Sequence, residues 1–403
     1  MIVRAWAERS RAEDEVLIHY QKVPGLSEAR LRHLVETISS SVDRGEYWGA
    51  RIMVARHGAV GLDAAIGYAD RERTRPIEDR SVFTIFSMTK AMTNILTLKA
   101  VEDGRYSLAT KISEVIPEFS GGLREHITVF HCLTHMSGLP MLFQLRPGMP
   151  IDKLEDMIRV TCETVQAEEP AGQSCRYSPM LNQLLQGELL RRTDPKGRSY
   201  RDLVREDLFE PLKMSDSAIG LRKDLVSRHL FPDFRGNSPI NHIGSSNLGE
   251  NGAFREELAE MPWVGAVSTT PDIFRLAEML RNEGALGGQR ILSGSMVRQA
   301  RRCYTDDKPN ELYRVLANRD EWEVCPAYIG LGFSLRGTKM KNHMYGTQTS
   351  PETFGNYGAG STLFWVDPEL DLTFVCLSTG LMSSNRNIVR FHKLADITVS
   401  ALE

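Results

Sequence analysis

The sequence contains no long apolar run, and nothing in it approaches the stretch of about 20 apolar residues that a membrane-spanning helix needs. It also lacks a strong excess of charge of either sign. Lys and Arg total 49 and Asp and Glu total 52, so the net charge is −3. Neither a nucleic acid nor a membrane surface is therefore expected as a partner. The short basic pieces RNEGALGGQR and RQARRCY are interpreted as solvated faces.

Cysteine is scarce, and no pair of cysteines has the CxxC spacing. This excludes the common zinc and disulfide frameworks and predicts reduced thiols. The N-terminal segment MIVRAWAERSRAEDEVLIHYQK carries a charge every few residues, which does not fit a secretory signal. A cytoplasmic location is expected, with no metal and no organic cofactor. The six cysteines are Cys132, Cys162, Cys175, Cys303, Cys325 and Cys376.

The sequence also lacks a G-x-S-x-G pentapeptide, which argues against the α/β-hydrolase fold. It has instead a single Ser-x-x-Lys match, from Ser87 to Lys90, at the start of an apolar, helix-like stretch. On a helix these two positions share a face, so the amine can approach the hydroxyl. A desolvated lysine can lose its proton near neutral pH and act as a base. The alternative is a lysine that extends to solvent from an amphipathic helix, and the motif alone does not decide between them.

The order of the expected elements is strands, helices, strands and a final helix. Helical spacing predicts helices over 27–45, 90–102, 271–286 and 385–402, and a mainly helical region over 112–214. Strands are predicted over 49–70, with a turn at His57-Gly58, and over 328–335, 361–368 and 370–379. The segment 231–254 is rich in Gly, Asn and Ser and is expected to be a loop at the rim of a site.

This order predicts an α+β fold. We expect one antiparallel sheet that is built from the N-terminal and C-terminal strands and flanked by helices. The predicted sheet domain is discontinuous, over residues 1–110 and 260–403, and a mainly helical insertion covers 111–259. A cleft between the two is the expected place for a site.

Several motifs follow Ser-x-x-Lys in a fixed order, and together they resemble a known family. They are ITVFHCLTHMSGLP, EPAGQSCRYSPMLNQLLQGELL, LFEPLKMSDS, GAVSTTPDIFRLAEML, YIGLGF and FGNYGAGSTLFWVDPELDL. From about Gly49 to Thr379 the chain is similar to the serine β-lactamase and penicillin-recognising superfamily. It most resembles the class C β-lactamase-like branch, which includes family VIII carboxylesterases and polyketide acyltransferases. The resemblance implies the β-lactamase/transpeptidase-like fold.

The resemblance also implies roles for individual residues. Ser87 would be the acylated nucleophile, and Lys90 would activate it. Tyr177, in the YSP motif, would share the base role as a phenolate. An oxyanion hole would be formed by the backbone N–H groups of Ser87 and Ala359.

Two positions depart from the family pattern. Many members have Asn where this chain has Pro179, so the polar contact of that side chain is absent. The third motif, usually Lys-Thr-Gly or His-x-Gly, reads Asn356-Tyr357-Gly358. Gly358 still permits a close approach of the strand, and Asn356 could donate a hydrogen bond to substrate. The missing cation weakens the interpretation of the chain as a β-lactamase or peptidase.

Other residues have structural as well as functional interpretations. His131 and His135 are four residues apart, a spacing that can bind zinc, but packing and hydrogen bonding are favoured. Tyr177 could be a buried tyrosine with a satisfied hydroxyl. Trp263 and Tyr357 could line an acyl pocket, although aromatic residues are more often part of the core.

The leading functional hypothesis is a cytoplasmic serine carboxylesterase that acts on a small-molecule ester through an acyl-enzyme. An acyltransferase would form the same intermediate and pass the acyl group to an alcohol or amine. A β-lactamase or D,D-peptidase is less favoured, and a non-catalytic member of the fold is a further alternative. The sequence does not fix the acyl group, the acceptor or the oligomeric state.

Overall fold

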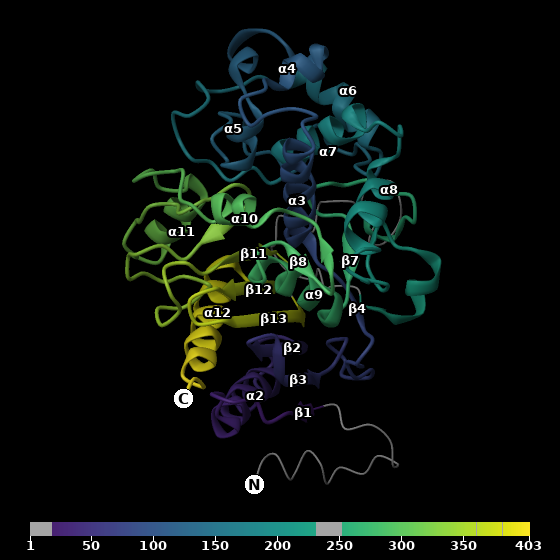
Figure 1. The fold of residues 1–403 in the computed structure, drawn as a ribbon. Coiled ribbons are helices and arrows are strands. Elements are labelled where there is room, and N and C mark those ends of the chain that lie inside the picture. Colours follow the sequence, from purple (N-terminus) through teal and green to yellow (C-terminus); the bar gives the residue numbers. More distant parts are fainter. Residues whose placement is uncertain (1–17, 231–251, 360, 381) are drawn as a thin grey trace.

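The computed structural model describes residues 18–230, 252–359, 361–380 and 382–403. Its main feature, within those residues, is a seven-stranded antiparallel sheet in the order β1-β3-β2-β13-β12-β11-β10. Near the middle of the sheet, Gly49 at the start of β2 pairs with Thr379 at the end of β13. The α+β fold, with a sheet built from both ends of the chain, is therefore confirmed (Figure 1). The strands are β1 (Ile18–Tyr20), β2 (Gly49–Arg56), β3 (Ala59–Gly67), β10 (Ser334–Leu335), β11 (Phe354–Gly358), β12 (Thr362–Asp367) and β13 (Leu372–Thr379).

Helices cover both faces of this sheet. On one face α2 (Glu28–Asp43) packs against β2 and β3 and against α12 (Ser384–Val399). The apolar side chains of α2 recur at helical spacing and are buried there, as predicted; they are Leu31, Leu34, Val35, Ile38 and Val42. On the other face α9 (Thr270–Arg281) packs against β2, β12 and β13. The hydroxyl of Thr269 caps α9 by accepting a hydrogen bond from the backbone N–H of Asp272.

Most of the remaining helices form a mainly helical region beyond the edge of the sheet, and α10 and α11 lie apart from it (Figure 1). α3 (Thr89–Glu102) extends into it and packs against α7 (Leu181–Thr193). α7 also contacts α4, α5, α6 and α8, and all of its residues from Leu181 to Leu190 are buried. The other helices are α4 (Ile112–Val115), α5 (Val129–Leu133), α6 (Leu154–Thr164), α8 (Tyr200–Val204), α10 (Gly294–Ala300) and α11 (Glu311–Arg319).

A second, smaller sheet was not predicted. Its strands lie in the order β5-β7-β4-β6, and β4 pairs antiparallel with β7 and parallel with β6. The strands are β4 (Val82–Thr84), β5 (Ala218–Ile219), β6 (His229–Leu230) and β7 (Ala266–Ser268), and β8 (Ala285–Leu286) pairs with β9 (Gln289–Arg290) in a hairpin. Because each strand has two or three residues, no alternation of apolar and polar side chains marks it in the sequence.

The prediction of a continuous strand over 328–335 is wrong. Only Ser334 and Leu335 belong to a strand, β10. Tyr328 and Gly332 have φ angles of +51° and +85°, and the N–H of Gly332 is 2.9 Å from the carbonyl oxygen of Gly330. These left-handed residues form tight turns that an extended strand does not allow. Most of the predicted rim loop, 231–251, lies outside the described residues.

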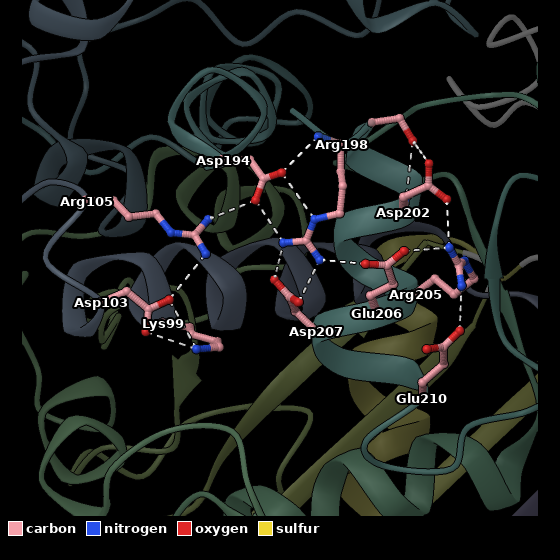
Figure 2. A network of polar contacts seen from close by, with 11 residues as sticks. Lys99, Asp103, Arg105, Asp194, Arg198, Asp202, Arg205, Glu206, Asp207 and Glu210 are labelled. Carbon is pink, nitrogen blue, oxygen red and sulfur yellow. Dashed lines mark hydrogen bonds and ion pairs between the residues drawn. The ribbon is translucent and has the colours of Figure 1, made fainter. Parts of the chain in front are cut away.

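An ion-pair network joins the C-terminal end of α3 to the segments around α8 (Figure 2). Arg198 lies at its centre: the guanidinium nitrogens are 2.8 Å from carboxylate oxygens of Asp194 and Asp207 and 3.0 Å from Glu206. Arg105 lies 3.8 Å from Asp194 and links the group to the segment after α3. The network therefore connects three segments that are separate in the sequence. Glu206 and Asp207 belong to a π-helical turn, η4 (Arg205–Phe209), that continues α8.

One apolar core runs from the sheet into the helical region, and it includes Val375 and Leu377 of β13 together with Leu184 of α7. The division into a sheet domain and an insertion over 111–259 stays a prediction. All six cysteines are free thiols. None of the helices in the described segments has the length and apolar character to cross a membrane.

Candidate active site

Ser87 lies on a short 3₁₀ helix, η1 (Phe86–Met88), between β4 and α3. Phe86 and Met88 are buried on either side of it, and Phe86 has a left-handed φ of +48°. A non-glycine residue in this region is uncommon and costs roughly 1–3 kcal/mol, so the surrounding structure must hold the turn in place. Part of that support comes from β7, since the N–H of Ile85 donates to the carbonyl of Ala266 at 3.1 Å.

Lys90 does not extend to solvent, because the residue is only 2% exposed. Its Nζ lies 3.1 Å from Ser87 Oγ. It also lies 2.8 Å from the carbonyl oxygen of Pro179 and 3.0 Å from that of Trp263. Burial holds the pKa of the Lys90 amine well below its usual value. A neutral amine has two N–H groups for the two carbonyls and a lone pair for the Ser87 hydroxyl, so this geometry suits a base.

Tyr177 completes the group around Ser87. Its hydroxyl donates to Ser87 Oγ at 2.8 Å, and Lys90 Nζ lies 5.2 Å from the centroid of its ring. Burial raises the pKa of Tyr177 to about 12, and the hydrogen bond to Ser87 offsets this only in part. The geometry thus brings the three predicted catalytic residues together. The raised pKa favours a neutral phenol at physiological pH rather than the expected phenolate.

The environment of Tyr177 includes one residue whose contact the sequence did not indicate. The centroid of the His135 ring lies 5.0 Å from the centroid of the Tyr177 ring. Its Nδ1 accepts the backbone N–H of Ser178 at 3.0 Å and lies 3.3 Å from Nδ2 of Asn182. Burial lowers the pKa of His135 to about 3, so it stays a neutral acceptor. These contacts join Ser178 and Asn182, which follow Tyr177 in the sequence, to the histidine whose ring lies against that of Tyr177.

Pro179 contributes a contact in spite of its side chain. The family's Asn is missing at this position, but the carbonyl oxygen of Pro179 accepts a hydrogen bond from Lys90 Nζ. Trp263 plays a similar part, because its carbonyl contacts Lys90 while its side chain is buried in the core. The interpretation of Trp263 as a core residue is confirmed. Backbone contacts of this kind leave no signal in the sequence.

The third motif lies on β11, which packs against the turn that carries Ser87. A Cβ atom at Gly358 would lie 2.2 Å from the carbonyl oxygen of Ile85, so only glycine allows this approach. The hydroxyl of Thr362 on β12 donates to the same carbonyl at 3.1 Å. Ala359, half-buried, follows directly. Its N–H is thus placed by a strand that is tied to the Ser87 turn.

The other two residues of the motif are Asn356, which is buried, and Tyr357, which is half-buried. Asn356 is buried, with 8% of its surface exposed. Tyr357 packs edge-on against Phe391 of α12, with ring centroids 6.2 Å apart, and joins the core on that face of the sheet. Their roles in substrate binding, like the oxyanion hole, stay predictions.

No group of three or more His, Cys, Asp and Glu side chains suited to a metal occurs among the described residues. His131 instead lies beside the residue that caps α5, with Nδ1 3.0 Å from the hydroxyl of Thr128. The arrangement around Ser87 brings together a hydroxyl, a buried amine with a lowered pKa and a buried phenol.

Comparison with known proteins identifies the family. The family model described as Beta-lactamase matches residues 34–397, most of the chain. A curated relative, "Esterase/beta-lactamase LipL" of Mycobacterium tuberculosis, is 24% identical over 388 residues, which cover 90% of this chain and 84% of the relative.

Solved structures show the same fold. The crystal structure of a family VIII carboxylesterase superposes with a TM-score of 0.75 at 20% identity, covering 95% of this chain and all of the other. Simvastatin synthase (LovD) from Aspergillus terreus gives a TM-score of 0.70 at 18% identity, covering 91% of this chain and 98% of the other. At these identities the likeness extends to the fold alone.

Proposed function

This chain belongs to the Beta-lactamase family of serine hydrolases, and from that premise we propose that it is a carboxylesterase that acts on small-molecule esters through an acyl-enzyme on Ser87. The observation that carries the proposal is the position of Ser87 Oγ. It lies 3.1 Å from a buried lysine amine and 2.8 Å from a tyrosine hydroxyl. A serine whose proton has such an acceptor at hand is an activated nucleophile.

Acylation begins when Ser87 Oγ attacks the ester carbonyl and gives its proton to the neutral amine of Lys90. The carbonyl oxygen becomes an oxyanion, which the N–H groups of Ser87 and Ala359 stabilise. Tyr177 then donates its proton to the leaving alkoxide, and the tetrahedral intermediate collapses to the acyl-enzyme. Lys90 returns the first proton to Tyr177, so the pair is reset when the alcohol has left.

Deacylation uses the same groups in the same order. Water loses a proton to the neutral Lys90 as its oxygen attacks the acyl carbon. The second tetrahedral intermediate releases Ser87 Oγ, which recovers a proton from the pair. An alcohol or amine can replace water in this step, which would make the protein an acyltransferase. Hydrolysis and acyl transfer would begin from the same acyl-enzyme on Ser87. The fold shared with simvastatin synthase is compatible with the transfer reaction.

The decisive experiment is the hydrolysis of short-chain p-nitrophenyl esters by the protein and by Ser87→Ala, with intact-mass detection of the acyl adduct. We expect activity and adduct to vanish together in Ser87→Ala. Ser113→Ala, a half-buried serine outside the site, is the matched control and should behave like the unmodified protein. Hydrolysis that persists in Ser87→Ala would overturn the proposal.

The acceptor is tested by adding alcohols to the same reaction and analysing the products. Hydrolysis alone at high alcohol concentration supports an esterase, and a transferred acyl group supports an acyltransferase. Rapid turnover of a chromogenic cephalosporin would favour a β-lactamase instead. The missing third-motif cation leads us to expect little turnover, because Asn356 has no charge for the substrate carboxylate.

A further inference from the structure

A surface cavity of about 640 Å³ lies away from Ser87. Its wall includes Arg298 of α10 and Arg301 and Arg302 just after it, together with Tyr328 and the turn at Gly337-Thr338. The arginines belong to RQARRCY, which the sequence alone presents as a solvated face. In the structure this piece encloses a space large enough for a small molecule.

The cavity is separate from the candidate active site. Leu335, another wall residue, pairs with Phe354 at the first position of β11. Gly358, at the last position of β11, is the residue that approaches the Ser87 turn. Because a strand rises by about 3.3 Å per residue, the two ends of β11 lie roughly 13 Å apart. A ligand in the cavity therefore does not occupy the position of the reacting carbonyl.

The charges of the wall are unbalanced. It contains three arginines and one carboxylate, that of Glu352, which lies 3.3 Å from Arg301. Arg298 pairs with Glu283, which lies outside the wall, at 2.6 Å. Arg302 is hydrogen-bonded at 3.3 Å to the neutral amide of Gln299 and keeps its full charge at the cavity. Arginine recognises phosphate and carboxylate through two parallel N–H groups.

Part of the lining is apolar and lies close to a further cation. Leu335, Pro351 and the ring of Tyr328 provide apolar surface. Lys341 Nζ lies 5.0 Å from the centroid of the Tyr328 ring, so a fourth positive group lies near this wall. An organic anion with an apolar body would match both parts of the lining.

We propose that this cavity binds a small organic anion, whose phosphate or carboxylate group contacts Arg298, Arg301 and Arg302 and whose apolar body packs against Tyr328 and Leu335. This goes beyond the proposed function and does not depend on it. The anion is either a free ligand or the charged end of a long ester substrate.

The test is a calorimetric titration at low salt with phenyl phosphate, and phenol serves as the neutral control. We expect saturable binding of phenyl phosphate only. Arg302→Gln should weaken binding by about tenfold, since it removes a charged hydrogen-bond donor. Glu352→Gln should strengthen it severalfold, because Arg301 loses its competing partner. Arg314→Gln, an exposed arginine of α11, is the matched control and should bind as the unmodified protein does.

Cys303 lines the same cavity and allows the bound ligand to be located. It is the exposed one of the six cysteines. Phenyl phosphate should slow its reaction with a neutral disulfide reagent, and Cys303→Ser should abolish that reaction. No saturable binding, equal binding by Arg302→Gln, or binding without protection of Cys303 would each overturn the proposal.

Enzyme kinetics distinguish the two sources of the anion once binding is found. Competition between phenyl phosphate and a long ester with a terminal carboxylate identifies the charged end of a substrate. Binding without such competition identifies a separate ligand. If Ser87 proves not to be catalytic, the titration and the Cys303 protection still decide this proposal by themselves.

Discussion

The amine of Lys90 lies among three oxygen atoms and is almost fully shielded from water, and this environment sets the pH at which it can act. Burial opposes the charged form, so its pKa falls well below the usual value. In the proposed mechanism the base is the neutral form, which is populated above that pKa. Activity that depends on it must therefore rise as the pH increases.

We expect kcat/KM for a p-nitrophenyl ester to increase with pH along one sigmoidal limb, with its midpoint well below the pKa of a free lysine. No alkaline fall is expected until the pH approaches about 12, where Tyr177 ionises. With an alkyl ester, whose leaving alkoxide needs a proton, Tyr177→Phe should lower the rate by about 10²–10⁴-fold and leave the midpoint in place, because it removes the proton donor and not the base. A midpoint that disappears in Tyr177→Phe would instead assign the base role to Tyr177.

His135 is a candidate positioning residue, since it contacts Tyr177 and not Ser87. His135→Phe would leave the N–H of Ser178 without its acceptor and should lower kcat by about tenfold with little change in KM. Asn at this position keeps an acceptor and tolerates the φ of +55°, so His135→Asn should restore part of kcat. Equal losses in both variants, matched by equal losses of thermal stability, would indicate a merely structural role.

At the scale of the elements, the π-helical turn after α8 is held by ion pairs from Arg198 to Glu206 and Asp207. Arg198 is about 10% exposed and Asp194 is fully buried, and Figure 2 shows how the two connect the segments around them. The hydrogen bond from Arg198 holds the pKa of Asp194 below its usual value. The network therefore stabilises the fold above pH 4 and loses that contribution as the pH falls below the usual pKa of an aspartate.

Arg198→Gln should reduce the free energy of unfolding by about 3 kcal/mol at neutral pH, because the buried carboxylate of Asp194 loses its closest cation and keeps only Arg105, 3.8 Å away. Urea denaturation measures the loss. Arg205→Gln, which removes an arginine that is 47% exposed on the same turn, should cost less than about 1 kcal/mol. The difference between the two variants should shrink at acidic pH. Similar losses for both at pH 7 would contradict the central role of Arg198.

Elements with a clear period were predictable from the sequence. The buried stripe of α2 and the left-handed turn at His57-Gly58 between β2 and β3 are local features that need no other part of the chain. The small sheet is different, since β4 and β7 pair through two residue pairs across a wide separation in sequence. Tertiary packing stabilises such short strands, so no local pattern in the sequence predicts them.

The same distinction applies to the site. Ser87, Lys90 and Tyr177 were predictable because the family motifs mark their side chains. The carbonyls of Pro179 and Trp263 and the ring contact of His135 were not, because the fold rather than the residue type brings them to Lys90 and Tyr177. The state of Tyr177 was also missed, since its pKa depends on burial that only the assembled structure provides.

At the scale of the whole molecule, the two ends of the described chain lie together. The N–H of Ser27 donates to the carbonyl of Ala401, and the N–H of Glu403 donates to that of Gly25. The helices α2 and α12 also contact one another, and in Figure 1 the C-terminal end of α12 lies beside α2. In the strand order of this sheet, β13 and β12 lie between the N-terminal strand β2 and the strand β11 that carries the third motif.

A chain that stops after Gly358 should therefore fail to fold, although it keeps Ser87, Lys90 and Tyr177. It lacks β12, β13 and α12, so β2 has no partner on that side and the core beneath α2 is open. We expect no cooperative unfolding transition by circular dichroism and no labelling by a serine-reactive phosphonate. A cooperative transition together with specific labelling of Ser87 would show that the sheet does not require its C-terminal half.

The central place of β13 also has a consequence for biosynthesis. The ribosome makes β2, β3 and the segment with Ser87 long before β13, the strand that lies between β2 and β12. During that interval the apolar faces of β2 and α2 are uncovered, which is the situation in which nascent chains rely on chaperones. The order of the strands thus delays the assembly of the sheet beside Ser87 until β13 has been made.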